Sequence, residues 1–176
     1  MATMILLPDS TDLGASANWI ASAGGRHECL DDDNGDTSFV SCDDNGSRMV
    51  LGYANPSVDE ADIDSIDSVR FISSGRSTDR ASSSVVNIKF QAPTAGFEEA
   101  CDFDKHASSY ETINGTARTT SDGSNAWTYA NLEALKMRCT KSLTKNVRLS
   151  YLALEVTYTE VGAAVADNAT FFGANF

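Results

Sequence analysis

Short apolar runs alternate with polar residues along much of the chain. The clearest example closes the sequence, where Leu152, Leu154, Val156 and Tyr158 share one parity. Because successive side chains of a strand point to opposite faces, this spacing predicts a half-buried strand. The same period-two spacing recurs in three earlier apolar sets: Met49, Leu51 and Tyr53; Val69 and Phe71; Val86, Ile88 and Phe90.

The last strand changes parity at its start. Val147, Leu149 and Tyr151 are spaced two apart but fall on the positions opposite to those of the following apolar set. This change predicts either a β-bulge or a segment that is covered on both faces.

One segment departs from period two. Between Trp127 and Met137, Leu132 and Leu135 stand three apart, and Asn131 is available near the start as a cap. We therefore expect a helix of about two turns there.

Acidic, glycine-containing turns separate the apolar segments. Residues 31–36 read Asp-Asp-Asp-Asn-Gly-Asp, and residues 43–46 read Asp-Asp-Asn-Gly. Asn and Gly tolerate the positive φ of tight hairpins, so these turns favour antiparallel strands. With a single short helix, crossover helices for a parallel sheet are lacking. The pattern predicts an all-β, antiparallel, jelly-roll-like β-sandwich.

The length of 176 residues fits one domain with its own core. We expect the sandwich to occupy residues 1–160, followed by a C-terminal tail or arm over residues 161–176. That tail is small and nearly uncharged but carries Phe171, Phe172 and Phe176. Burying each ring stabilises by about 2 kcal/mol, so we expect the three rings to pack on this domain or on a neighbouring subunit.

The formal net charge of −12 argues against nucleic acid as a partner, since phosphate binding needs a basic face. Apolar runs are far shorter than the roughly 18 residues of a membrane helix, so no membrane association is expected. One basic stretch interrupts the acidity. The structural interpretation of this stretch is a solvated turn and strand edge. The functional interpretation is contact with an acidic protein surface. It comprises Lys136, Arg138, Lys141, Lys145 and Arg148.

The residues that bind metals are scattered. Cys29, Cys42, Cys101 and Cys139 form no CxxC pair, so a zinc site with His27 or His106 is poorly supported and buried free thiols are expected. A Cys29–Cys42 bridge is the alternative for a protein that matures outside a cell. The acidic turns hold enough oxygens for calcium, but their spacing does not match an EF-hand loop. We therefore expect no cofactor, with calcium at these turns as the minor alternative.

Catalytic motifs are scarce. The sequence has no glycine-rich phosphate loop, no GxSxG and no HExxH. Glu98-Glu99, Asp102 and Asp104 offer carboxylate pairs, which chance alone explains in a chain with 25 acids. Trp19 and Trp127 are candidates for sugar stacking, with a core position as the favoured interpretation. We therefore predict a protein that is not an enzyme.

The order of segments resembles a known group of proteins. Leu6-Leu7-Pro8-Asp9, an early Trp19, an acidic turn before Thr37-Ser38-Phe39-Val40, and a closing strand at 147–158 carry the similarity. The chain thereby resembles β-sandwich structural proteins of tailed bacteriophages that act as capsid decoration, cement or minor structural proteins. The similarity covers residues 5–158, and the tail from Val161 departs from it.

This resemblance implies a virion protein that is made in the host cytoplasm. Its expected partners are the major capsid protein or other virion proteins, and it is expected to form a homo-oligomer, with a trimer as one form. The alternative function is a carbohydrate-binding or receptor-binding module of a phage tail or fibre, and a small glycan-degrading enzyme is the third. The resemblance carries over no catalytic residue.

Overall fold

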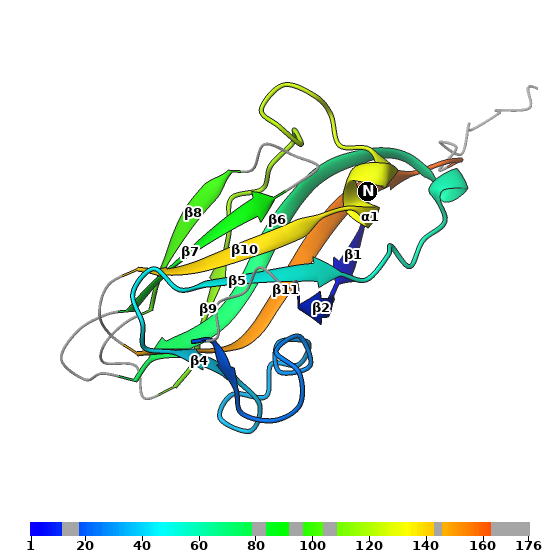
Figure 1. The fold of residues 1–176 in the computed structure, drawn as a ribbon. Coiled ribbons are helices and arrows are strands. Elements are labelled where there is room, and N and C mark those ends of the chain that lie inside the picture. Colours follow the sequence, from blue (N-terminus) through cyan, green and yellow to red (C-terminus); the bar gives the residue numbers. More distant parts are fainter. Residues whose placement is uncertain (12–17, 79–83, 92–96, 104–108, 143–145, 163–176) are drawn as a thin grey trace, which may run out of the picture.

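Two antiparallel sheets pack face to face, and one short helix closes one end (Figure 1). The predicted all-β sandwich is therefore confirmed. The structure is a computed structural model, and the residues that it describes are 1–11, 18–78, 84–91, 97–103, 109–142 and 146–162.

The first sheet is built around β11 (Val147–Glu160) and β6 (Ile63–Ser77), the two longest strands, which pair along almost their whole length. On the far side of β6 lies β9 (Glu111–Asn114). The side of β11 that faces away from β6 is shared by two strands. Its first residues pair with β4 (Val40–Cys42), which continues to β3 (Ile20–Ala21), and its last residues pair with β1 (Ala2–Leu6).

The second sheet has the order β2-β5-β10-β7-β8. Its outer strands are β2 (Pro8–Thr11) and β8 (Glu98–Phe103), and only Leu7 separates β2 from β1 of the first sheet. The N-terminal segment therefore crosses from one layer to the other at this point. The three inner strands are β5 (Arg48–Tyr53), β10 (Lys136–Ser142) and β7 (Ser84–Gln91).

The core lies between the sheets and follows the predicted parities. Val69, Phe71 and Ile88 are buried, whereas Arg70 between the first two is partly exposed and pairs with Glu155. A hydrogen bond also joins the layers, because the Tyr53 hydroxyl donates to the Leu152 carbonyl over 3.1 Å. The other period-two sets are buried as well: Met49, Leu51 and Tyr53; Val86 and Phe90; Leu152, Leu154, Val156 and Tyr158.

The predicted change of parity in β11 is a β-bulge. The register with β6 shifts between Leu149 and Tyr151, so Ser150 is the extra residue. Leu149 on one side of the bulge and Leu152 on the other are both fully buried. The bulge thus lets Val147 and Leu149 face the same core as Leu152, Leu154 and Val156, whereas Tyr151 stays partly exposed.

The predicted helix is shorter than expected and begins differently. The helix α1 spans Tyr129–Glu133, and its N-cap is Thr128. Asn131, which was predicted as the cap, instead occupies the third helical position and completes a capping box with Thr128. Met137, at the end of the predicted helix, belongs to β10, because its side chain fills the core between the sheets.

Both tryptophans belong to the core, as the favoured interpretation had it. Trp19 is fully buried and its indole N–H donates to the Ser47 carbonyl. Trp127 is also buried, and its ring meets Phe90 edge to face at 6.0 Å between centroids. The four cysteines are free and buried: Cys29, Cys42, Cys101 and Cys139.

Candidate functional site

The predicted basic stretch is divided by the alternation of β10. Lys136 is exposed and Arg138 is partly exposed on the outer face of the second sheet. Lys141 has the parity of Met137 and Cys139 and is fully buried with them. The stretch therefore does not form one surface.

The environment of Lys141 is polar main chain rather than solvent. Its ammonium donates to the Asp43 carbonyl over 3.2 Å, and its amide donates to the Ser47 carbonyl over 3.0 Å. Burial lowers the pKa of Lys141, although negative charge at Cys42, Asp43 and Asp44 opposes this shift. Lys141, which was predicted as a partner contact, is therefore not on the exposed surface of the chain.

Arg148 lies on the other sheet and binds an acidic turn of the same chain. Its guanidinium contacts Asp36 at 2.8 Å and lies 4.2 Å from the centre of the Phe39 ring. Arg76 of β6 binds the same carboxylate at 2.6 Å. Desolvation works against ionisation of Asp36, but the hydrogen bond from Arg148 and the charges of Arg76 and Arg148 outweigh it and lower the pKa.

These contacts give the acidic turn of residues 31–36 a structural role. Asp33 accepts a hydrogen bond from Ser150 at the bulge of β11, and Asp36 is held by two arginines. The turn is thereby fastened over the outer face of the first sheet. Within the described ranges, no group of three or more His, Cys, Asp or Glu side chains is arranged to hold a metal ion.

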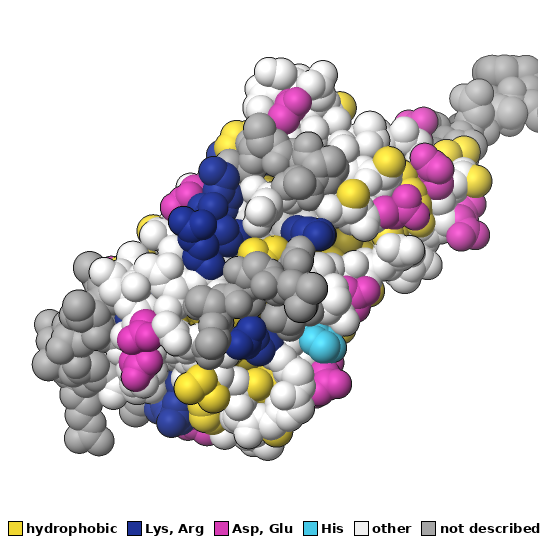
Figure 2. Space-filling view, viewed as in Figure 1, with side chains coloured by type: hydrophobic (Ala, Val, Ile, Leu, Met, Phe, Trp, Pro, Cys, Tyr) yellow, Lys and Arg dark blue, Asp and Glu magenta, His cyan; other side chains and the backbone are white. Residues whose placement is uncertain are grey.

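The second sheet carries a different arrangement on its outer face. Arg138 of β10 lies opposite Lys89 of β7 and near Arg48 of β5, which lies opposite Thr140. We call Arg48, Lys89, Lys136 and Arg138 the basic row. Figure 2 views the molecule from this side and shows Lys and Arg side chains gathered where Figure 1 places β7 and β10.

Like charges directly opposite each other destabilise a sheet, so the basic row has an energetic cost. Glu98 of β8 offsets part of it, because its carboxylate contacts Arg138 at 3.2 Å and its backbone lies opposite Lys89. The row gathers four cationic side chains on one face of the second sheet. A positive strip on a chain of net charge −12 is a candidate binding surface for an acidic partner.

The alternation of the two strands places Arg48 and Lys89 on the faces opposite to their apolar sets, but it does not connect them with Lys136 and Arg138. Parity alone places each side chain on a face, whereas the basic row depends on which strands are neighbours. That information is in the register of β10 with β5 and β7. The remaining predicted contact residues lie outside the described residues, as does His106: Lys145, Phe171, Phe172 and Phe176.

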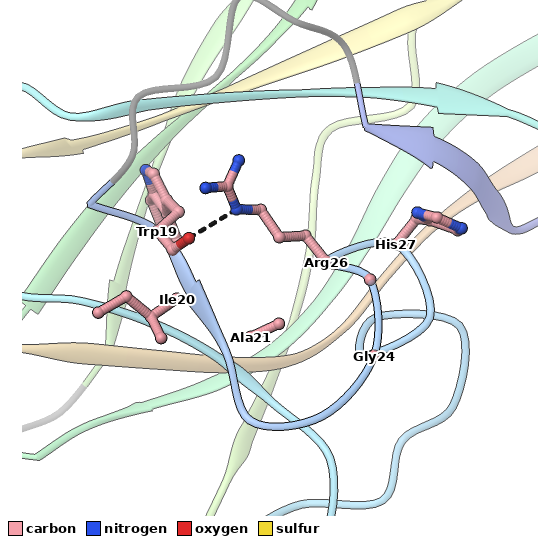
Figure 3. Close-up of a pocket in the computed structure, with 7 residues that line it drawn as sticks. Trp19, Ile20, Ala21, Gly24, Arg26 and His27 are labelled. Atoms are coloured by element: carbon pink, nitrogen blue, oxygen red, sulfur yellow. Dashed lines mark hydrogen bonds between the residues drawn. The ribbon is translucent and has the colours of Figure 1, made fainter.

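A second feature is an open hollow of about 560 Å³ beside β3 (Figure 3). Trp19 and Ile20 line one side, and Arg26 and His27 line the other. The Arg26 Nε donates to the Trp19 carbonyl over 2.6 Å, which fixes this loop against the strand. Because the Trp19 ring is fully buried, the hollow offers no exposed indole for stacking on a sugar.

The adjacent candidate carboxylates Glu98 and Glu99 do not face each other, and Asp104 lies outside the described residues. Glu98 points to the outer face and contacts Arg138. Glu99 points the other way, where it binds Arg118 and accepts a hydrogen bond from the Thr116 amide N–H. A glycosidase needs two carboxyl groups across one cleft, and this adjacent pair does not provide them.

Comparison with known proteins yields no assignment. No protein-family model matches the chain, and no curated protein sequence matches it. None of the helices among the described residues is long and apolar enough to cross a membrane. A functional proposal therefore depends on the surfaces of the chain and on the resemblance noted in its sequence.

Proposed function

We propose that the protein is a virion structural protein that decorates the outer surface of a phage head. The observation that carries this proposal is the basic row, which concentrates positive charge on one sheet face of a strongly acidic chain. The sequence resemblance to phage decoration and cement proteins supplies the biological setting. The major capsid protein, or another virion protein, is the proposed partner.

The charge distribution supports an oriented attachment. In this arrangement the basic row faces an acidic patch of the shell, while the acidic remainder of the chain faces solvent. Complementary charge fixes orientation and accelerates association more than it adds affinity. Many copies on one lattice then turn a modest contact into stable attachment.

The test is cosedimentation with phage heads that lack the protein, at about 50 and 300 mM salt. The double variant Lys89→Gln with Arg138→Gln removes two positive charges from the row. We expect at least a tenfold loss of affinity at low salt, and weaker binding of the unmodified protein at high salt because ions screen exposed charges.

The control is Thr112→Glu with Asn114→Glu, at two exposed positions of β9 on the other sheet. It changes the net charge by the same two units and should bind heads as the unmodified protein does. Equal loss in both variants would show that net charge alone governs binding. Unchanged binding of the row variant, or no binding of the unmodified protein, would overturn the proposal.

A further inference from the structure

The strand β1 has one unpaired edge. Its five residues pair with Leu154–Tyr158 of β11 in continuous register, and within the described part of the chain no strand pairs with its other side. An open edge presents backbone N–H and C=O groups that can pair with a further strand.

Exposed apolar side chains gather at this edge. Ile5 on the outer face is 44% exposed and Leu7 is 36% exposed. Scattered apolar residues are normal on a surface, but their concentration beside an open edge indicates an interaction site.

The edge also lacks the charges, prolines and bulges that often prevent pairing. Residues 2–6 contain no charge and no proline, and no bulge interrupts their pairing with β11. The nearest outer-face charge is Glu155, directly opposite Ile5, and Arg70 neutralises it at 2.8 Å. Short uncharged segments of this kind are prone to pair with further strands.

We propose that β1 docks against β1 of a second copy of this chain, in antiparallel orientation across a twofold axis. An uncharged strand is suited to such self-pairing, because every charge that it carried would face its own equivalent across the axis. Centred on Met4, the pairing places Ile5 beside Thr3 of the other copy. It also joins the two first sheets into one continuous sheet.

This inference goes beyond the proposed function. The β1 edge belongs to the first sheet and the basic row to the outer face of the second, so one contact does not require the other. Five paired residues bury less than a standard interface, and we therefore expect a dissociation constant in the micromolar range. Because each copy carries a net charge of −12, added salt should strengthen the dimer.

Sedimentation velocity of the full chain from about 1 to 500 μM, at low and high salt, tests this proposal. We expect a monomer–dimer equilibrium that Ile5→Lys weakens at least tenfold. Thr112→Lys adds the same charge on β9 and should leave the equilibrium unchanged. A far-ultraviolet spectrum identical to that of the unmodified chain would show that the Ile5→Lys variant is folded.

Three results would overturn the proposal. The first is a chain that stays monomeric at all concentrations, and the second is a dimer that Ile5→Lys does not weaken. The third concerns the other available occupant of the edge, the chain's own residues 163–176. If the full chain is monomeric but a variant ending at Gly162 dimerises, that segment covers the edge and a second copy does not.

Discussion

The strands β1 and β8 both lie at sheet edges, but their chemistry differs. Residues 2–6 of β1 contain no charge, and Ile5 is 44% exposed. In β8, Glu98 and Asp102 are exposed on the outer face, and Glu99 reaches over to bind Arg118. Acidic side chains keep a second strand away from β8, whereas nothing comparable protects β1. The difference indicates that one edge is closed by its side chains and the other is available for pairing.

The largest effects on the free energy of unfolding should come from the buried residues that anchor the two edge strands. Leu6 of β1 and Phe103 of β8 are both buried. Phe103→Ala should cost about 3–5 kcal/mol of unfolding free energy and Leu6→Ala about 2–5 kcal/mol, because each leaves a cavity. Denaturant unfolding measures both losses.

The two anchors should differ in their effect on assembly. Only Leu6→Ala should also abolish dimerisation under conditions where the variant remains folded, since Leu6 holds β1 against β11. Dimerisation that is lost equally in the Phe103→Ala variant would contradict the assignment of the contact to β1. Sedimentation of both folded variants makes this comparison.

The period-two alternation did not identify these two anchors, but it predicted the core residues of several longer strands. Alternation identified the inward residues of most long strands because burial of one sheet face imposes period two. Lys141 had the inward parity too, yet a long charged side chain was expected at the surface. Its burial depends on the main-chain oxygen of Asp43, which comes from a distant turn. Pairings between distant segments, including those that assemble the basic row, have no local signal.

Alkaline pH should lower the free energy of unfolding by about 2 kcal/mol through a buried thiol of the β8 edge. Burial, followed by the charge of Glu99, raises the pKa of the β8 residue Cys101 to about 12. An unfolded thiol ionises near pH 8.5–9, so the folded state retains the proton that the unfolded state loses, and stability falls as pH rises above that value. By pH 10.5 this thiol should lower the free energy of unfolding by about 2 kcal/mol.

Unfolding measured at pH 8 and pH 10.5 tests the effect of Cys101. The Cys101→Ala variant should lose less stability over this interval than the unmodified chain. Part of the slope should remain, because burial raises the pKa of Cys139 as well. Equal slopes in both proteins would show that Cys101 does not contribute.

Removing the charges of β8 should have a smaller effect on association, because each new contact between strands contributes about 1 kcal/mol. Glu98→Val with Asp102→Val would leave β8 as open as β1, so species larger than the dimer should appear at the highest concentrations. Glu98→Lys with Asp102→Lys keeps the edge charged and should remain a dimer. Larger species in both variants would indicate disruption of β8 rather than new pairing.

Amide hydrogen exchange at two protein concentrations tests the central comparison most directly. Measured at about 5 and 500 μM, the amides of β1 that point away from β11 should become more protected at the higher concentration. The amides of β8 should exchange at the same rate at both. Exchange in β1 that does not depend on concentration, or protection that rises equally in β1 and β8, would contradict the account.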